Sequence, residues 1–578
     1  MNVRPRAWLL LLLGVCGCSR SDRVAPADLV LRHADIHTMD DATPRATAIA
    51  VKGDRILWVG EDRDAARFIG STTRVIDAGG RLLLPGFIDS HFHVGLGNDP
   101  NVERITGKSL REIQAQIKAF SDRRPDLTWI EMDGWNYSAL SAGTLPTAAD
   151  LEGLTRGRPA FLIAYDYHTV WMNREALAAF GITKGTRSVS FAERVERDPK
   201  TGAPTGILIG FGSAGLSEQA EIDLRKHLPS HSAEGGEERV LDLMRRAARE
   251  GITTIVEPQT YLETVPLYAR LEQEHRLPQR LQVALFHRRG TSEADIARFL
   301  EARTRYASDW FRVAAVKLYI DDVIEPRTAA MLEPYADRPG ARGDTVYPVE
   351  EFNQVVARLD RLGFQIFTHA IGDRGIRTAL DAYEHARRAN GTRDSRHEIV
   401  HVECLSEPDV PRFHGLGVTA CMQPRHGAPD LSAEWARAVG PRRWNYAWAF
   451  RSLRDTGATL AFGSDWNVAE MEPAIGIYTA VTRKGLDGRP EEGWVPGQAI
   501  DLDTAVKAYT ITGAYANFLE GNRGSLVPGK YADLVLLSEN LFTIAPEKIK
   551  DVRPVWTVVG GKEVWRNFQA GNRDSGSP

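Results

Sequence analysis

Two histidines separated by one residue, His91 and His93, follow a short apolar run that begins at Phe87. On a β-strand, residues i and i+2 point to the same side, so two imidazoles at this spacing can hold one metal ion. A single His-x-His pair is more often two surface histidines on a loop. Here four later strand-like segments also end in a residue that can bind a metal, and this recurrence favours a metal site.

Those later residues lie at or near the C-terminal ends of apolar segments of strand length. They are Lys317, His369, His401 and Asp465. Imidazole and carboxylate groups suit Zn²⁺, with Fe²⁺ or Mn²⁺ as alternatives, and an incomplete protein ligand set leaves a position for water. The sequence therefore predicts a site for one or two divalent ions.

Each of these residues also has a simpler role open to it. An ammonium group repels a cation, so Lys317 must be neutralised, paired or modified to take part, and an ordinary salt bridge is the simpler interpretation. His369 and His401 can be core histidines, and Asp465 can cap a following helix. Convergence of these residues on one point of the fold would decide for the metal site.

The middle of the chain alternates strand-like and amphipathic segments, which predicts a parallel sheet with helices between its strands. The candidate strands are 87–91, 253–256, 281–285, 313–319, 364–368, 398–402, 418–422 and 459–463. Eight strands, each followed by a helix such as 238–250 or 355–362, predict an α/β fold of the (β/α)8 barrel type over residues 85–519. In that fold the C-terminal strand ends meet at one mouth, where catalytic groups lie.

The loop after the first strand, from about 94 to 235, is long enough to form a lobe of its own over the barrel mouth, and its segment 160–164 reads as a strand. Residues 28–84 and 520–567 both read as short strands with tight turns. We predict that these two ends form one composite β-sandwich domain. Gly53-Asp54 and Gly79-Gly80 are predicted hairpin turns, and Gly560-Gly561 is another tight turn.

Composition places the chain among ordinary globular proteins and excludes some functions. It has 578 residues, 43% of them hydrophobic and 26% charged, which allows a large core and more than one domain. The net charge of −4, from 72 basic and 76 acidic side chains, gives no electrostatic case for a nucleic-acid partner. The four cysteines do not indicate a disulfide framework, and nothing in the sequence specifies an oligomeric state.

The N-terminus has the pattern of an export signal. Arg4 and Arg6 precede a short apolar stretch, so residues 1–18 are predicted to be a signal peptide. The segment Val15-Cys-Gly-Cys18 resembles a bacterial lipobox, in which Cys18 would be lipidated, although Cys16 is unusual there. We expect an exported protein, either periplasmic or anchored as a lipoprotein, whose only membrane contact is this anchor; plain secretion is the alternative.

The chain resembles the amidohydrolase superfamily and, within it, the YtcJ-like branch (amidohydrolase family 3), which includes N-substituted formamide deformylases. The resemblance runs from about residue 28 to 565. It rests on Leu84-Pro-Gly-Phe-Ile-Asp-Ser-His-Phe-His93, Asp166-Tyr-His-Thr-Val-Trp-Met-Asn173, Thr201-Gly-Ala-Pro-Thr-Gly206, Val316-Lys-Leu-Tyr-Ile-Asp321, Thr368-His-Ala-Ile-Gly-Asp373, Gln423-Pro-Arg-His426, Gly463-Ser-Asp-Trp466 and Gly524-Ser-Leu-Val-Pro-Gly-Lys-Tyr-Ala-Asp533. These motifs are specific in this order and spacing.

The resemblance implies a role for each metal-capable residue. His91 and His93 would bind the more buried ion, and an N-carboxylated Lys317 would bridge two ions. The second ion would be held by His369 and His401. Asp465 would bind the first ion and act as general base or proton shuttle.

Two positions depart from the family pattern. Asp322 follows Asp321 where glycine is common, and Asn467 stands where proline is common after the last motif. Both departures concern loops that line the pocket, so they bear on the substrate more than on the metal chemistry. A one-metal site with an unmodified Lys317 stays open.

The resulting hypothesis is a metal-dependent amidohydrolase that cleaves a non-peptide C–N bond of a small molecule, in an amide, an N-formyl group or a cyclic amide. Candidate substrate contacts are His168, Trp171, Asn173 and His426, although His168 can equally serve to pack the lobe. One alternative is a dipeptide, N-acyl amino acid or ester hydrolase, whose substrate carboxylate could be held by Arg425, Arg442 or Arg443. The other is a lipid-anchored binding protein without turnover.

Overall fold

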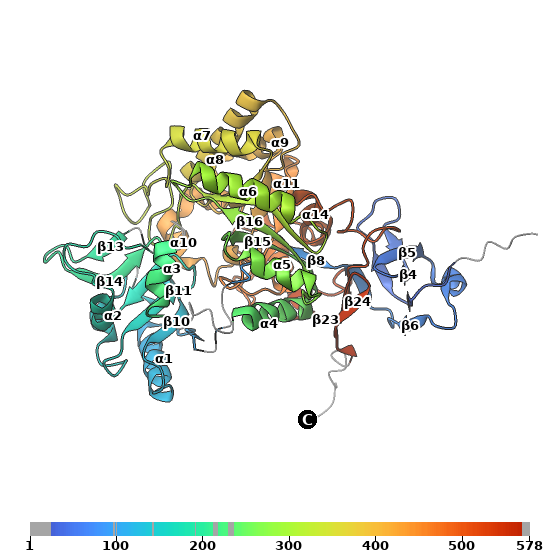
Figure 1. The fold of residues 1–578 in the computed structure, drawn as a ribbon, viewed down its shortest axis with the longest axis horizontal. Helices are drawn as coiled ribbons and strands as arrows, with labels where there is room; N and C mark the ends of the chain where they lie inside the picture. The colour runs from blue at the N-terminus through green and yellow to red at the C-terminus, as the bar shows by residue number, and fades with distance from the viewer. Residues whose placement is uncertain are drawn as a thin grey trace, which may run out of the picture.

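The computed structural model describes residues 25–568 apart from 96–98, 100, 142–143, 191, 193, 212–217 and 229–235. The predicted signal peptide, residues 1–18 with Cys18, lies outside the described residues. A central barrel separates a lobe (teal, left) from a pair of small β-sheets (blue and red, right), as Figure 1 shows. Within the described part of the chain, no helix has the length and apolar character needed to cross a membrane.

The barrel is an 8-stranded sheet whose parallel strands follow one another in chain order. The strands are β8 (Phe87–Asp89), β15 (Ile252–Thr260), β16 (Arg280–Phe286), β17 (Phe311–Tyr319), β18 (Gln365–Ala370), β19 (Glu398–His401), β20 (Thr419–Met422) and β21 (Leu460–Phe462). The sheet nearly closes, because the Ser90 amide donates to the Phe462 carbonyl at 3.0 Å and the Asp465 amide to the His91 carbonyl at 2.7 Å. The predicted (β/α)8 barrel is confirmed.

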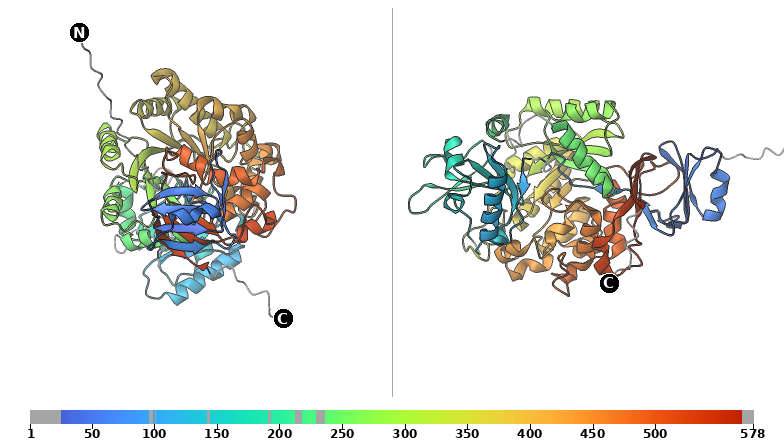
Figure 2. Two further views of the ribbon diagram at one scale, coloured as in Figure 1. Left: turned by 90° about the vertical axis from the view of Figure 1, so that its right-hand side faces the viewer. Right: turned by 90° about the horizontal axis from the view of Figure 1, so that it is seen from below.

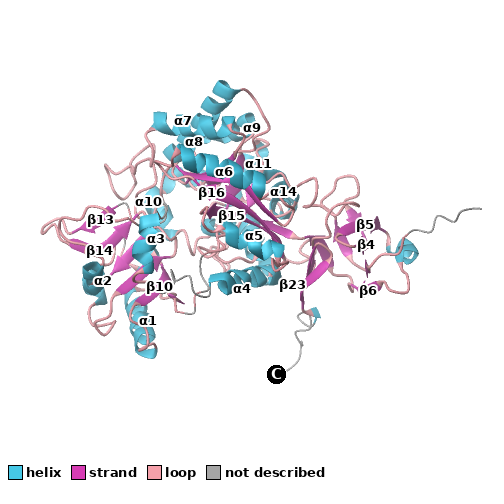
Figure 3. Cartoon of the chain, viewed as in Figure 1, coloured by secondary structure: helices cyan, strands magenta, loops and turns pink. Residues whose placement is uncertain are grey.

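The barrel strands are apolar because both of their faces are buried. Ile88, Val256, Phe367 and Val400 pack against one another in the cluster that fills the barrel interior. Helices cover the outside of the strands (Figure 3). They include α4 (Gly236–Arg249), α5 (Val265–Gln273), α6 (Glu293–Arg305), α7 (Val349–Arg361), α8 (Asp373–Asn390), α9 (Val410–Leu416), α11 (Phe450–Asp455), α12 (Pro473–Thr482), α13 (Leu502–Ala508) and α14 (Ile511–Ala516).

The segment between β8 and β15 folds as a lobe with its own 6-stranded sheet, in the order β13-β14-β12-β11-β10-β9. Its elements are β9 (Glu103–Arg104), α1 (Leu110–Arg123), β10 (Ile130–Trp135), β11 (Ala160–Ala164), β12 (Thr169–Met172), α2 (Arg174–Ala179), β13 (Arg194–Arg197), β14 (Pro204–Ile209) and α3 (Glu218–Arg225). The Tyr165 hydroxyl donates to Glu325 Oε1 at 2.8 Å, which ties this lobe to the mouth of the barrel. The predicted inserted lobe is therefore present.

Both ends of the chain build the β-sandwich (Figure 2). One sheet has the order β5-β4-β1-β6 and the other β24-β23-β22-β7-β2-β3. The strands are β1 (Leu29–Arg32), β2 (Asp35–His37), β3 (Arg45–Ala46), β4 (Ala48–Lys52), β5 (Arg55–Gly60), β6 (Arg74–Asp77), β7 (Leu82–Pro85), β22 (Leu534–Leu537), β23 (Pro554–Val559) and β24 (Lys562–Arg566). Leu83 of β7 pairs with Leu536 of β22, and Leu31, Leu83 and Trp556 share one core. The composite sandwich is confirmed.

One predicted hairpin of the sandwich is wrong. β6 pairs in parallel with β1, whereas β7, the next strand, belongs to the other sheet. The turn at Gly79-Gly80 therefore carries the chain from one sheet to the other. Gly53, with a φ of 59°, does lie in the hairpin turn between β4 and β5.

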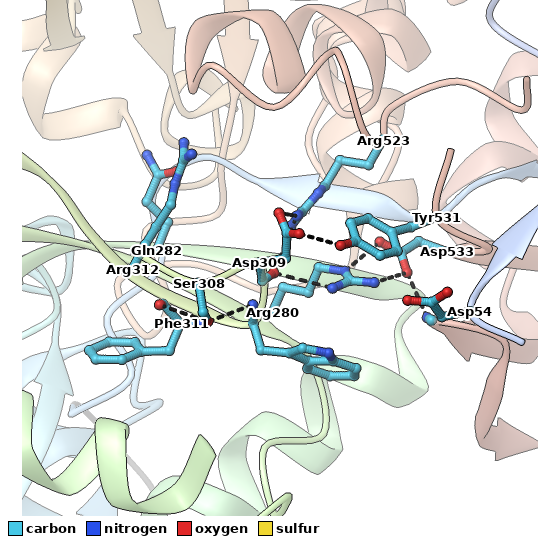
Figure 4. Close-up of polar contacts among 12 residues, drawn as sticks. Asp54, Arg280, Gln282, Ser308, Asp309, Phe311, Arg312, Arg523, Tyr531 and Asp533 are labelled. Atoms are coloured by element: carbon cyan, nitrogen blue, oxygen red, sulfur yellow. Dashed lines mark hydrogen bonds and ion pairs between the residues drawn. The ribbon is translucent and has the colours of Figure 1, made fainter. Parts of the chain in front are cut away.

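A buried ion pair joins the sandwich to the base of the barrel (Figure 4). Arg280, the first residue of β16, donates from Nε to Asp533 Oδ2 at 2.8 Å. The Arg280 and Asp533 side chains are only 1% and 4% exposed, and the Arg280 guanidinium lies 3.8 Å from the centroid of the Tyr531 ring. The Gly560 amide, in the turn between β23 and β24, also donates to Asp533 Oδ1, at 2.7 Å. The Asp533 carboxylate therefore joins this turn of the sandwich to strand β16 of the barrel.

Candidate metal centre

The two histidines of the His-x-His pair lie at the barrel mouth, but on a loop and not on a strand. β8 ends at Asp89, so strand alternation does not orient them. Instead, the Phe92 amide donates to the Val256 carbonyl at 3.0 Å and the His93 amide to the Trp466 carbonyl at 3.1 Å. The imidazoles of His91 and His93 are 5.3 Å apart between ring centroids.

Asp465 stands between the imidazoles that the sequence predicts to share metal ions. Its Oδ1 lies 3.1 Å from His93 Nε2 and 3.5 Å from His91 Nε2, and its Oδ2 lies 3.7 Å from His401 Nδ1. Asp465 has a left-handed backbone conformation, with a φ of 57°, which is uncommon outside glycine and often found at functional sites. Burial raises the pKa of Asp465, but the surrounding imidazoles hold it well below its usual range.

His369 and His401 form the opposite wall of the same centre. Their ring centroids are 4.5 Å apart, and the His401 ring lies 5.0 Å from that of His91. Burial lowers the pKa values of all three imidazoles well below the usual range, so they are in the neutral form that binds metal ions. His93 differs, because Asp465 and Glu257 outweigh burial and raise its pKa to about 9, so a metal must displace a proton there.

Lys317 lies on the interior of the barrel beneath these groups and is completely buried. Its Nζ has no hydrogen-bond partner among the described residues, and it lies 4.9 Å from the centroid of the Tyr319 ring. Burial lowers the pKa of Lys317 to about 8. The simple salt bridge that is open to this lysine on sequence grounds is therefore not formed in the structure.

The residues at the mouth fit a divalent ion. Ligand atoms of His91, His93 and Asp465 lie within 4.8 Å of one another, and so do those of His401, His426 and Asp465. Several buried polar atoms there lack a hydrogen-bond partner within the described chain, which is costly unless something else binds them. These atoms are His91 Nδ1, Lys317 Nζ, His369 Nδ1, His426 Nε2 and Asp465 Oδ1.

Two polar residues that support the centre were not singled out from the sequence. Glu257 Oε1 lies 3.4 Å from His93 Nδ1, and Gln423 Oε1 lies 2.8 Å from His401 Nδ1. Glu257 holds the His93 ring with its other nitrogen, Nε2, toward Asp465, and Gln423 fixes the His401 ring, as is common around metal ligands. Each directly follows a predicted strand, so the rule that found the histidines would have found these residues too.

A cavity of about 1130 Å³ opens beside the centre, between the barrel mouth and the lobe. His168 and His426, two of the predicted substrate contacts, line it. The His168 ring lies 5.6 Å from that of His369, and its Nδ1 bonds the Asp322 carboxylate. Burial lowers the pKa of His168, but the Asp322 carboxylate outweighs burial and raises this pKa to about 9.

The two residues that depart from the family pattern, Asp322 and Asn467, join the lobe to the barrel. Asp322 bonds His168 of the lobe, as described above. Asn467 Nδ2 donates to Asp133 Oδ2, on β10 of the lobe, at 3.2 Å. These residues therefore set the position of the lobe over the cavity.

The other two predicted substrate contacts are corrected. Trp171 is fully buried in the lobe, and its indole nitrogen donates to the Thr147 carbonyl at 2.8 Å. Asn173 caps α2 by accepting from the Ala176 amide. Neither residue lines the cavity. Both lie on one short segment with His168, but strand and cap geometry turn them into the lobe core.

The three arginines proposed to bind a substrate carboxylate also lie away from the cavity. Arg425 makes hydrogen bonds to Asp430 and Glu470, so its charge is already paired. Arg443 donates to backbone carbonyls, including that of Val439, and Arg442 is exposed. None of them lines the cavity.

Comparison with known proteins gives one consistent result. A family model described as "Amidohydrolase family" matches residues 74–565. "Protein LONG AFTER FAR-RED 3" of Arabidopsis thaliana is 30% identical over 561 residues, covering 93% of this chain and 92% of that protein. "N-substituted formamide deformylase" of Arthrobacter pascens is 25% identical over 558 residues, covering 92% and 97%.

A solved structure has the same fold. It is an "uncharacterized metal-dependent hydrolase" from Pyrococcus horikoshii OT3, with a TM-score of 0.69 and 22% identity. The match covers 90% of this chain and 99% of that one. The barrel, lobe and sandwich thus recur together in another protein.

Proposed function

The chain belongs to the amidohydrolase family, and we propose that it is a metal-dependent hydrolase that cleaves a non-peptide C–N bond in an amide, an N-formyl compound or a cyclic amide. One observation carries this proposal. The Asp465 carboxylate lies within 3.7 Å of three imidazoles, two from the loop after β8 and one from the end of β19, and it lines a cavity large enough for a small molecule. The similarity to a formamide deformylase supports an N-formyl substrate.

We propose Zn²⁺ as the ion, with Fe²⁺ and Mn²⁺ as alternatives, because imidazole and carboxylate groups suit all three. His91, His93 and Asp465 would hold one ion, and His369 and His401 a second. When bound, a divalent cation acts as a Lewis acid that polarises a carbonyl oxygen and makes water more acidic.

Lys317 is proposed to become a carbamate. Its uncharged amine would attack CO₂, forming an N–C bond and releasing one proton. The depressed pKa of about 8 supports this step, because more of the lysine is then uncharged near neutral pH. The product carries the negative charge that a bridging ligand needs, in place of the positive charge that repels a cation.

Asp465 is proposed to move the proton during hydrolysis. Its carboxylate lies at the cavity, and its pKa is well below the usual range, so it is ionised and can accept a proton from the attacking water. The same carboxyl group would pass that proton to the departing nitrogen as the C–N bond breaks. His93, 3.1 Å from Oδ1, holds the carboxylate in place between these two transfers.

Metal removal tests the proposal. Chelated, metal-free protein is expected to lose hydrolysis of N-formyl, N-acyl and cyclic amides, because no Lewis acid is then present to polarise the carbonyl oxygen or make the water more acidic. Activity against such a panel, with elemental analysis of the same samples, is the measurement, and Zn²⁺ or Mn²⁺ should restore it. Full activity in metal-free protein would refute the mechanism.

Glu257 gives a second test of the same centre. Replacing it with glutamine (Glu257→Gln) is expected to weaken metal binding by about 10- to 100-fold, because a neutral amide orients His93 less firmly than a carboxylate does. Competition with a chelating dye measures this affinity. Glu263→Gln is the matched control, since Glu263 lies at the cavity rim with a side chain that is 75% exposed; equal affinities of the two variants would contradict the assigned role.

Two other functions are weaker candidates. A hydrolase for N-acyl amino acids or dipeptides needs a group for the substrate carboxylate; Arg425, Arg442 and Arg443 do not line the cavity, so another arginine that does, such as Arg104 or Arg288, would have to serve. A lipid-anchored binding protein without turnover would need no metal, so a purified protein that is folded, metal-free and inactive after metal loading would support it.

We also propose that the protein is exported and anchored through Cys18. The signal-like residues 1–18 support this proposal. Expression in a bacterium with a lipoprotein pathway should place the wild type in the membrane fraction and a Cys18→Ala variant in the soluble fraction.

A further inference from the structure

Three buried carboxyl groups line the cavity. They are Asp166 from the lobe, Glu325 after β17 and Glu403 after β19. The three residues are only 7%, 6% and 6% exposed, respectively. Carboxyl groups from three distant segments are therefore gathered at one buried place beside the metal centre.

No lysine or arginine of the described residues is paired with Asp166 or Glu325, although the His168 imidazole offsets part of the effect of burial on the pKa of Asp166. The nearest arginine in sequence, Arg327, gives its guanidinium to Asp337 and Glu434. The carboxylate of Glu325 accepts a hydrogen bond from the Tyr165 hydroxyl at 2.8 Å, and that of Glu403 lies 3.5 Å from His426 Nδ1.

One oxygen atom of Asp166 lacks a hydrogen-bond donor. Its Oδ1 accepts from the His168 amide at 3.0 Å, but its Oδ2 has no hydrogen-bond partner in the described structure although it is buried. The adjacent Tyr137 hydroxyl is hydrogen-bonded to Thr169 Oγ1 at 2.7 Å. An acceptor that is buried, charged and unpaired is costly to the fold unless a ligand supplies the donor.

The three carboxylates also act on one another. Burial and the charge of Glu403 raise the pKa of Glu325 to about 8. Near neutral pH Glu325 is therefore mostly protonated, and it would release its proton when a cation enters among the three groups. The aromatic faces of Tyr165 and Trp448, which also line the cavity, can add cation–π attraction.

We propose that Asp166, Glu325 and Glu403 bind a protonated amino group of the substrate, so that the substrate class is an amide with a second, cationic nitrogen on a short spacer. This inference rests on the proposed hydrolase function. His426 sets the spacing, because its Nε2 lies 3.7 Å from Asp465 Oδ2 while its Nδ1 lies 3.5 Å from Glu403 Oε1. The His426 imidazole thus separates Asp465, at the reacting bond, from Glu403 of the amine-binding group.

Two formamides that differ only in the distal group test the proposal. Mono-N-formyl butanediamine ends in an ammonium group, and N-pentylformamide ends in a methyl group of similar size. The wild type is expected to favour the cationic amide by about 10- to 100-fold in kcat/KM, as for one or two charge-assisted hydrogen bonds. A ratio of one or less would overturn the proposal.

Substitutions assign the preference to these carboxylates. Glu325→Gln and Asp166→Asn keep the shape and can still accept from Tyr165 and from the His168 amide, so the fold should be retained. Each is expected to lower the ratio by about 10-fold, because kcat/KM falls more for the cationic amide than for N-pentylformamide. Glu263→Gln, an equal charge change at the rim, should leave the ratio unaltered. A wild-type ratio in both site variants would overturn the assignment.

A binding experiment separates this proposal from the hydrolase function. Titration calorimetry with pentylamine and with pentanol needs no turnover. Tighter binding of pentylamine that is lost in Glu325→Gln would support the amine site even if no amide is hydrolysed. Equal binding of pentylamine by the wild type and Glu325→Gln would refute the amine site even in an active amidohydrolase.

Discussion

An Asp465→Asn variant is expected to lower kcat for amide hydrolysis by about 10²- to 10⁴-fold, the usual contribution of a positioned general acid–base group. The amide that replaces the carboxylate is nearly the same size, but it cannot accept the proton of water or return it to the departing nitrogen. It can still offer an oxygen atom to the nearby imidazoles. The loss should therefore appear in kcat and only secondarily in KM.

Steady-state kinetics on the best amide from the panel, with elemental analysis of each preparation, makes this measurement. Asp455→Asn is the matched control, because Asp455 ends α11, does not line the cavity and has a side chain that is 56% exposed. Its activity should equal that of the wild type. An Asp465→Asn enzyme with more than a tenth of wild-type kcat and a full metal content would rule out a proton-shuttle role.

The largest expected effect on stability comes from the junction of barrel and sandwich. An Arg280→Ala variant leaves the Asp533 carboxylate buried, 4% exposed, without its partner. Removing one member of a buried ion pair costs about 3–5 kcal/mol, because the remaining charge is not solvated. The midpoint of thermal denaturation should fall by several degrees, and the loss of the stacking on Tyr531 adds to the effect.

Arg74→Ala provides the comparison on the same sandwich. Arg74 pairs with Glu563 at 2.6 Å, but the Arg74 side chain is 46% exposed, and such surface pairs contribute at most about 1 kcal/mol. Differential scanning fluorimetry of both variants measures the two midpoints. If Arg280→Ala melts no lower than Arg74→Ala, the junction does not depend on the buried pair.

The barrel and its strand ends could be predicted because they follow from local patterns. Apolar segments such as 313–319 and 398–402 alternate with amphipathic ones, and parallel strands place their C-terminal ends at one mouth. His369 and His401 were therefore placed together without any coordinates. The His91 and His93 pair was placed correctly at the mouth, although the loop after β8, and not a strand, orients it.

In the loops, the directions of the side chains could not be predicted from the sequence. His168, Trp171 and Asn173 are neighbours in one motif, yet only His168 reaches the cavity, because Trp171 packs inside the lobe and Asn173 caps α2. Arg425 was likewise a candidate for binding a substrate carboxylate, but its guanidinium is paired with Asp430 and Glu470. No periodicity in a sequence specifies which direction such residues face.

By itself, the sequence determined the order of the strands, the metal-capable groups at their ends and the composite sandwich. These depend on contacts between neighbours along the chain and on the rule that parallel strands end together. Only the tertiary structure decided which side chains share the cavity. Asp166, Glu325 and Glu403 come from segments that no local pattern connects, and they meet because the lobe folds back over the barrel mouth.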